Sequence, residues 1–472
     1  MAKKLCKPFP APIPFRKLLG PSFIILALGL GSGEVILWPF LASQFGLGIA
    51  WGALLGITFQ YFMNMEIERY SLVRGESVFV GLSRMWRAAP YWFIASTFLG
   101  FGIPGIIAAS AKVASHLLGI SEHKYIAIGF LILIGIILSA GKTVYGMMER
   151  ITKTILLLGT PFVFLLAILL ASKTDWAALA RGLGGIGESL GGQPAYFLLP
   201  AGISFATFLA AFAYSGAGGN LNLTQSIYVK EKGYGMGKYA QRMAGLFTSK
   251  RDEAIKLTGE ECDYSERSLK NFRAWWKLVS LEHGIVFWLM GLLTMAFLML
   301  LSYATAFKQG GNLGEGIAFV ISEGTIIGQH LNPAVGILFL AAVVVMLFQT
   351  QMGVLDSTSR IMAENLALKQ MGKKRKTNLS KIYYGFLWAQ IAFGTVLFLA
   401  DFKEPLTLIV LGAVINAVAM FVHLGMVNWM NAKVLPQSVQ APLWRKAVIA
   451  GIFLFFGFFS AITIYTQLGK FF

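Results

Sequence analysis

The chain has 472 residues, of which 56% are hydrophobic and only 13% are charged. A soluble protein of this length exposes far more charge, so the composition excludes a water-soluble globular protein. The formal net charge of +18 would suit nucleic-acid binding, but the positions of the lysines and arginines indicate a membrane topology signal instead.

Apolar stretches of about 20 residues recur along the whole chain, and each could cross a hydrocarbon core of roughly 30 Å. The first begins near Phe23, behind a basic N-terminal segment, and is too long for the apolar region of a signal peptide. We therefore interpret it as a retained span. We predict an all-α integral membrane protein with about eleven transmembrane helices near 20–43, 48–67, 91–117, 124–141, 150–171, 198–229, 279–303, 332–364, 381–400, 405–430 and 445–467.

Lysine and arginine fall on alternate loops between these spans. The basic segments are the N-terminus, 68–90, 142–153, 230–278, 365–381 and 431–446. This positive-inside bias places the N-terminus in the cytoplasm and the C-terminus outside. We therefore predict a multi-pass protein of the plasma membrane or bacterial inner membrane, with the lipid bilayer as partner and no nucleic acid.

The polar interval 230–278, read as a partly helical cytoplasmic loop, separates the first six spans from the last five. Eleven spans can be divided into two units of five and one extra helix, and the odd number inverts the second unit relative to the first. The expected units are 1–171 as first repeat, 172–197 as extracellular loop, 198–430 as second repeat and 431–472 as the eleventh span.

The first helix of each predicted repeat contains a cluster of glycines in mid-span. Span 1 carries Gly31-Ser32-Gly33, and span 6 carries Gly216-Ala217-Gly218-Gly219. Glycine weakens a helix by roughly 1 kcal/mol per residue, so both spans are predicted to be discontinuous around a central site. The alternative is close helix packing, because Gly29 and Gly33 form a G-x-x-x-G pair.

Glu34 follows the first glycine cluster. A carboxylate near the middle of a bilayer costs at least ~2.5 kcal/mol and marks a functional site by default. Its alternative role is to cap the second half of a broken helix, where free N–H groups favour a negative charge.

Other polar residues lie near the two clusters or at the ends of spans. Tyr214 and Ser215 bring oxygen atoms to the second cluster, and Gln349 interrupts the apolar run of span 8, where it either lines a cavity or bonds a neighbouring helix. Asp356 follows nearer the cytoplasmic end of the span, where it either belongs to this polar group or pairs with Arg360, one helical turn on. The charged group Glu66, Glu68 and Arg69 closes span 2, where we expect solvated interfacial charges.

No cofactor is predicted. Two distant cysteines and five scattered histidines supply no zinc site, and both cysteines fall on cytoplasmic segments, which argues against a disulfide. No phosphate-binding G-x-x-x-x-G-K-[S/T] loop occurs, so the chain has no ATP engine of its own. Transport would be passive or coupled to an ion gradient.

Several segments resemble the natural-resistance-associated macrophage protein (Nramp) family of divalent-metal transporters. The similarity is weak and covers most of spans 1–10. It is carried by Gly20-Pro21 and the break after Gly31 in span 1, Phe59-Gln60-Tyr61 and Arg69 to Gly75 in span 2, Tyr145-Gly146-Met147-Met148-Glu149 in span 5, and Asn220-Leu221-Asn222-Leu223 in span 6. The resemblance implies the LeuT-type fold of inverted five-helix repeats.

The family's functional motifs are altered at the first break. Its Asp-Pro-Gly-Asn corresponds to Gly31-Ser32-Gly33-Glu34, so the metal-binding Asp is replaced by Gly31 and a carboxylate stands at the Asn position. The positions of the family's acidic pair in span 3 correspond to Gly102 and Gly105, and that of its span 10 Gln to Ala413.

The second break differs as well. The family's Met-Pro-His corresponds to Ala217, Gly218 and Gly219, which removes the thioether that favours softer metals. The backbone-carbonyl ligands, which need no particular side chain, carry over to Leu28 and Tyr214.

We therefore predict a secondary-active transporter, not an enzyme, with its site between spans 1 and 6. Glu34 supplies charge, and the neutral oxygens come from Leu28, Ser32, Tyr214, Ser215 and Gln349. A divalent metal cation is the leading substrate, because the resemblance implies it and Glu34 permits it. One alternative is a sodium- or proton-coupled carrier of a small organic solute, for which Gly218 and Gly219 leave room. Another is a non-transporting receptor or scaffold that docks through 230–278.

Overall fold

The computed structural model describes residues 6–18, 20–140, 144–188, 195–241, 256–310, 317–371 and 378–468. Segment 242–255, in the middle of the predicted cytoplasmic loop, lies outside the described residues. So does 189–194 in the predicted extracellular loop. Within the described chain the fold is helical except for β1 (Ile186–Gly187) and β2 (Tyr196–Phe197), which pair antiparallel.

The helices of the first half follow the predicted spans closely. They are α1 (Phe15–Leu18), α2 (Pro21–Gly29), η1 (Leu30–Leu37), α3 (Trp38–Phe45), η2 (Leu47–Ile49), α4 (Ala50–Arg74), α5 (Val78–Met85), α6 (Ala89–Phe101), α7 (Gly105–Leu118), α8 (His123–Ala140), α9 (Val144–Leu170) and α10 (Lys173–Leu183). Span 1 is α2–η1–α3, and span 3 is divided into α6 and α7 by the Gly102–Pro104 turn.

The second half contains the longest helices. They are α11 (Phe205–Ala213), η3 (Gly219–Leu223), α12 (Thr224–Lys232), η4 (Gly235–Tyr239), α13 (Glu266–His283), η5 (Gly284–Leu289), α14 (Met290–Thr305), η6 (Phe307–Gln309), α15 (Ala318–His330), α16 (Pro333–Met371), α17 (Leu379–Leu399), α18 (Pro405–Val434), η7 (Gln437–Val439) and α19 (Leu443–Leu468). Segment α13–η5–α14 is one continuous helical run of 40 residues.

Nine helical segments of the described chain are long and apolar enough to cross a membrane, so the protein is a multi-pass membrane protein. Two predicted spans are not among the nine. One is α4, whose polar residues lower its hydropathy, and the other is span 6, which is divided into α11 and α12 of nine residues each. The count of eleven spans stays a prediction.

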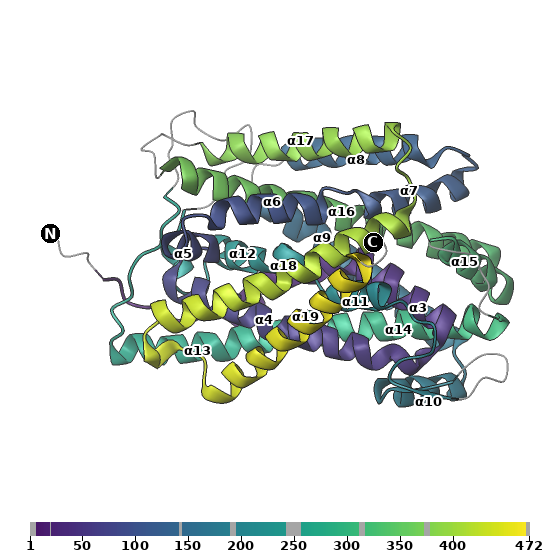
Figure 1. Ribbon diagram of the computed structural model, residues 1–472, viewed down its shortest axis with the longest axis horizontal. Coiled ribbons are helices and arrows are strands. Elements are labelled where there is room, and N and C mark those ends of the chain that lie inside the picture. The colour runs from purple at the N-terminus through teal and green to yellow at the C-terminus, as the bar shows by residue number, and fades with distance from the viewer. Residues whose placement is uncertain are drawn as a thin grey trace.

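The long helices run along one direction of the molecule (Figure 1). The N-terminus lies at the same end as α5, α12 and α13, whereas α10 and α15 lie at the opposite end. The N-terminal segment is attached both to the loop before α13 and to α13 itself, because the Lys7 N–H donates to the Glu261 carbonyl (2.8 Å) and the Phe9 N–H to Ser268 Oγ (2.9 Å). The two predicted cytoplasmic segments therefore share one end of the protein.

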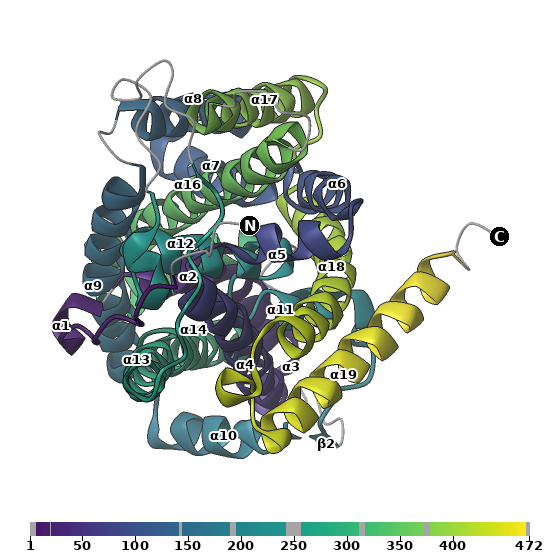
Figure 2. The ribbon, with the colours of Figure 1, turned by 90° about the vertical axis from the view of Figure 1, so that its left-hand side faces the viewer.

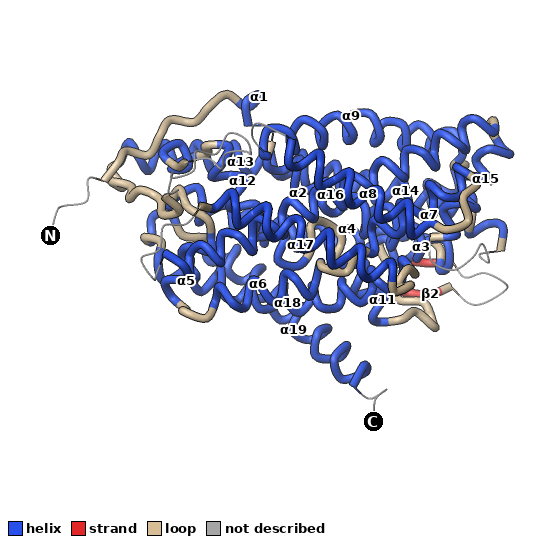
Figure 3. Tube along the Cα trace, turned by 90° about the horizontal axis from the view of Figure 1, so that it is seen from above, coloured by secondary structure: helices blue, strands red, loops and turns tan. Residues whose placement is uncertain are grey.

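Span 1 occupies the centre of the bundle. Figure 2, viewed along the bundle, shows α2 and α12 enclosed by α9, α16, α18 and α14. Every residue of α2 is buried. By contrast, the outer faces of α9 and α19 expose large apolar side chains such as Leu158 and Leu454, as expected for helices in contact with lipid. The C-terminal end of α19 projects from the bundle (Figure 3).

Candidate functional site

Span 1 is interrupted between α2 and α3. The regular α-helix is discontinuous, as the glycine cluster predicts, but residues 31–33 are not unwound. They belong to the π-helix η1, and the Trp38 N–H reaches back to the Gly33 carbonyl, five residues earlier. Short π-helical stretches are uncommon and often occur at functional sites. The expected form of the first break is therefore corrected from open backbone to a widened helix.

Span 6 is opened as predicted. Helix α11 ends at Ala213, and no regular helix resumes until η3 at Gly219. Gly218 and Gly219 have φ angles of 72° and 51°, which glycine adopts without steric cost. The carbonyls of residues 214–217 accept no backbone hydrogen bond from the described residues. Two of them are nevertheless covered, because the Tyr214 and Gly216 carbonyls pack against Gly33 and Gly29.

The two interruptions contact each other backbone to backbone. A Cβ at Gly29 would lie 2.5 Å from the carbonyl carbon of Gly216, and one at Gly33 would overlap the carbonyl oxygen of Tyr214. Both glycines are therefore required for close approach. Gly29 and Gly33 therefore make a close helix-packing contact, and this contact joins the interrupted segments of spans 1 and 6. Close packing and a discontinuous helix, the two interpretations of these glycines, apply together.

Gln60 of α4 holds the unwound segment in place. Its Nε2 donates to the Ala213 carbonyl (2.9 Å), and its Oε1 accepts from the Gly218 N–H (3.2 Å). One side chain thus satisfies backbone groups on both sides of the break, as irregular backbone inside a membrane requires. Gln60 is not among the predicted site residues, although an amide side chain in an apolar span is a usable signal.

Glu34 lies in η1 and is fully buried. Both of its carboxylate oxygens lack a hydrogen-bond partner among the described residues. The carboxylate lies beside α14, where a Cβ at Gly291 would be 3.6 Å from Oε1, and Leu26 and Ile57 contact the same point. Glu34 caps no helix, because η1 continues directly into α3 and leaves it no free N–H group. The capping alternative is therefore wrong.

Two of the predicted oxygen ligands, Ser215 and Gln349, form hydrogen bonds with other residues of the described chain. Ser215 Oγ accepts from Trp38 Nε1 (2.9 Å) and donates to the Ala211 carbonyl, so it is already engaged. Gln349 Nε2 donates to Thr152 Oγ1 on α9 (3.1 Å), which is the helix-bonding alternative for this residue. Its Oε1 has no partner among the described residues. Ser32 and Ala217 are buried in the same region.

The side of η1 and α2 that faces α16 is closed by Thr350. A Cβ at Gly31 would lie 2.7 Å from the Thr350 Cβ, and Thr350 Oγ1 donates to the Ala27 carbonyl (3.0 Å), next to Leu28. The Leu28 side chain packs against Gly353. Position 31, where the resembled family has its metal-binding Asp, therefore contacts a hydroxyl-bearing residue.

Asn416 of α18 is a site residue that the sequence analysis did not single out. Its Nδ2 donates to the Gly100 carbonyl and to Tyr214 Oη, both at 2.9 Å. A Cβ at Gly219 would overlap its side chain, and one at Gly218 would lie 2.6 Å from the Tyr214 ring. The room expected beside these two glycines is therefore filled by Tyr214 and Asn416.

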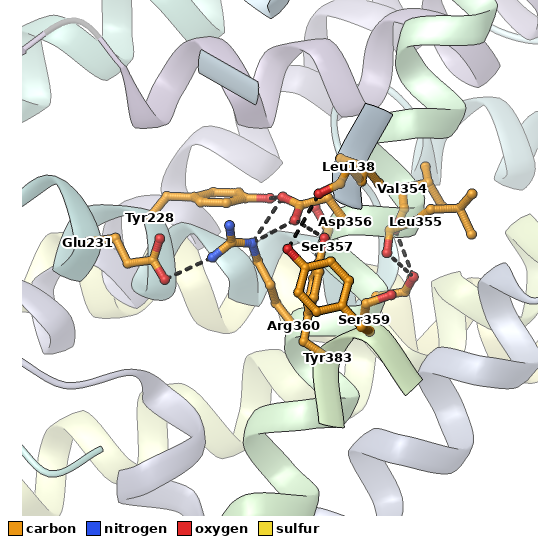
Figure 4. A network of polar contacts seen from close by, with 12 residues as sticks. Leu138, Tyr228, Glu231, Val354, Leu355, Asp356, Ser357, Ser359, Arg360 and Tyr383 are labelled. Carbon is orange, nitrogen blue, oxygen red and sulfur yellow. Dashed lines mark hydrogen bonds and ion pairs between the residues drawn. The ribbon is translucent and has the colours of Figure 1, made fainter. Parts of the chain in front are cut away.

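A second polar cluster joins α12, α16 and α17 toward the end that holds the N-terminus. Figure 4 shows Arg360 between Glu231 and Asp356, with distances of 2.8 Å to Glu231 and 2.9 Å to Asp356. Tyr228 and Tyr383 donate to Asp356 as well. Of the two possibilities left open for Asp356, the structure shows the pair with Arg360, which belongs to a buried network.

The charges that close span 2 are not solvated, contrary to expectation. Glu66 accepts from Arg69 and from Arg445 of α19, and all three side chains are buried. Glu68 is fully buried as well. The reason is tertiary, because η7 and α19 fold back over this end of α4.

No family model matches the sequence, and no curated protein is similar to it. Among solved structures, a mutant of the manganese transporter of Eremococcus coleocola superposes over 98% of this chain and 91% of its own, with a TM-score of 0.67 at 13% identity. The fold is that of the LeuT-type transporters.

Two further LeuT-type structures support this assignment. Mhp1, a nucleobase-cation-symport-1 family transporter, aligns over 89% of this chain and 79% of its own, with a TM-score of 0.51 at 13% identity. MhsT, in complex with L-phenylalanine, aligns over 94% and 97%, with a TM-score of 0.56 at 13% identity. All three structures are therefore similar to this chain in fold, over most of its length.

Proposed function

We propose that the protein is a secondary-active transporter of a divalent metal cation, which binds between η1 and the open segment of span 6. The fold supports transport, because the similar structures are a manganese transporter and carriers of small organic molecules. The resemblance of the sequence to a metal-transporter family supports the substrate class. The two interrupted segments contact each other in this conformation. In the proposed transport cycle they move apart when the binding site opens to one side of the membrane.

Glu34 is the observation that favours a cation. A buried carboxylate with no hydrogen bond and no counter-charge is strongly unfavourable unless a cation or a proton neutralises it. In the described chain, no group of three or more His, Cys, Asp or Glu side chains could hold a metal ion. We propose that the site joins the Glu34 carboxylate with backbone carbonyls of residues 214–217 and water once the two interrupted segments move apart, because the Tyr214 and Gly216 carbonyls pack against Gly33 and Gly29 in this conformation. Oxygen donors of this kind suit hard cations such as magnesium, calcium and manganese.

The organic-solute alternative has less support from the geometry. The space expected at Gly218 and Gly219 is occupied by Tyr214 and Asn416.

Divalent-ion flux into proteoliposomes tests the proposal. The Glu34→Gln variant keeps the shape of the side chain but loses its charge. Its affinity for the divalent ion should fall by roughly tenfold or more, because a charge-assisted contact contributes about 1.5–3 kcal/mol. Glu323→Gln is the matched control, since Glu323 is also buried but is bonded to Ser302 and Thr305 in α14. Unchanged binding in Glu34→Gln, or no divalent binding by the wild type at millimolar concentration, would reject the metal substrate.

A further inference from the structure

Helix α4 carries a row of buried polar side chains on the face toward span 6. Gln60, Asn64 and Glu68 are each four residues apart, so they lie one helical turn above one another. All three are fully buried. The row begins at the unwound segment, which Gln60 bonds, and leads toward the end of α4 that lies with the N-terminal segment.

A second carboxylate lies at the end of this row. Glu68 accepts from Gln225 of α12 (3.2 Å). Glu282 of α13 accepts from Ser22 of α2, which also lies 2.8 Å from His283 Nδ1. Spans 2 and 7 are in contact here, because the Tyr61 ring of α4 stacks on His283, next to Glu282, with 5.6 Å between the ring centroids. The Glu68 and Glu282 carboxyls are therefore near enough to influence each other's charge.

Both carboxyl groups are incompletely satisfied. Oε1 of Glu68 and Oε1 of Glu282 have no hydrogen-bond partner among the described residues, and neither do the two amide atoms of Asn64 directly above. No ion pair to either glutamate forms within the described chain. Two interacting carboxylates in a medium of low dielectric constant cannot both stay charged without a counter-ion, so one proton is the simplest neutraliser.

The cations around this cluster form their ion pairs with other carboxylates of the described chain. Arg69 and Arg445 both pair with Glu66, and His283 stacks on Phe287. The other titratable groups that act on this cluster are Tyr61, Lys153 and Lys232. The Tyr61 hydroxyl donates to the Ser280 carbonyl. The ammonium groups of Lys153 and Lys232 pair with Glu149, and their positive charges also favour the charged form of Glu282.

We propose that Glu68 and Glu282 form a proton-binding site that exchanges the coupling proton of the transport cycle with the side of the membrane facing the N-terminus. Ser22 and Gln225 donate to the carboxyl groups and stabilise a single negative charge. The proton converts one carboxylate to a carboxylic acid and leaves again as the free ion, so no other reactant is needed. This inference rests on the proposed transport function for its role, but the site itself can be tested without transport.

Infrared difference spectra of the purified protein between acidic and alkaline buffer test proton binding directly. The wild type should show the C=O stretch of a protonated carboxyl group, and this band should weaken in both Glu68→Gln and Glu282→Gln. The control Glu323→Gln removes a buried carboxyl group at the opposite end of the protein. A titrating band that is identical in the wild type and both cluster variants would overturn the proposal.

Proton flux in proteoliposomes, followed with a pH-sensitive dye while a divalent-ion gradient is applied, tests the coupling. In the wild type, the luminal pH should change at a rate proportional to the divalent-ion flux. The two cluster variants should lose proton movement, and Glu323→Gln should keep it. Wild-type proton flux that persists in both variants would refute the coupling role. Titrating bands without any divalent flux would refute the proposed transport function and leave the proton site standing.

Discussion

Position 217 decides, at the scale of single residues, how the proposed site would select among metals. Ala217 is buried in the open segment of span 6 and offers no side-chain ligand. With one carboxylate and carbonyl oxygens, selectivity follows ion size and hydration more than softness. Glu34 and Ala217 together therefore predict weak binding of hard divalent ions.

Ala217→Met should shift this selectivity. The thioether is a soft ligand, so affinity for cadmium or manganese should rise relative to magnesium and calcium. Competition binding by isothermal titration calorimetry measures the ratio. Ala217→Leu is the control, because leucine has a similar volume but no sulfur. Equal ratios in the methionine and leucine variants would show that position 217 does not face the ion.

At the scale of elements, the contact between η1 and the open segment depends on glycine at position 33. Gly33→Ala would place a methyl group against the Tyr214 carbonyl oxygen, which belongs to the backbone and cannot rotate away. Overpacking of this kind costs typically about 1–3 kcal/mol, so both thermal stability and transport should fall.

Gly129→Ala provides the matched comparison, because nothing lies within 4 Å of a Cβ at that position in α8. It should be neutral or slightly stabilising, since alanine favours helix by about 1 kcal/mol over glycine. A melting temperature of Gly33→Ala equal to that of Gly129→Ala would show that the two interruptions do not touch.

The Arg360 network links α12, α16 and α17. Arg360→Met leaves the buried carboxylates of Glu231 and Asp356 without a counter-charge, and such a loss costs about 3–5 kcal/mol. The apparent unfolding temperature in detergent should drop markedly. Lys256→Met, which removes a half-exposed pair with Glu260, should change stability by less than about 1 kcal/mol. Equal apparent unfolding temperatures for Arg360→Met and Lys256→Met would show that the network does not stabilise the helix bundle.

At the scale of the whole molecule, charge distribution and helix length together predict the topology. The run α13–η5–α14 has 40 residues. At 1.5 Å per residue such a helix is about 60 Å long, roughly twice the hydrocarbon thickness. Its two ends must therefore lie on opposite sides of the membrane.

Cysteine labelling tests this topology. In a Cys6→Ser background, Lys270→Cys near the start of the run should react only from the cytoplasmic side. Lys308→Cys, just beyond its end, should react only from outside. Both positions are exposed, and the remaining Cys262 is buried. Reaction of both cysteines from one side would contradict the predicted orientation.

The sequence by itself determined the membrane class, most span boundaries and the position of both interruptions. These depend on local properties, namely apolar length, glycine content and the alternation of basic loops. Glu34 could be singled out for the same reason, since a carboxylate in an apolar run is conspicuous without any neighbours. The spacing of Asp356 and Arg360 within one helix allowed their pairing but left a second possibility open.

Only the tertiary structure decided what these residues contact. Gly33 of η1 packs against Tyr214 and Gly29 of α2 against Gly216, and both partners lie in the other half of the chain. The burial of Glu66 depends on Arg445, and the support of the open segment depends on Gln60 and Asn416. A sequence specifies which side chains each helix carries, but the partners of a buried polar group are set by the rotation and register of helices against each other, which no local pattern encodes.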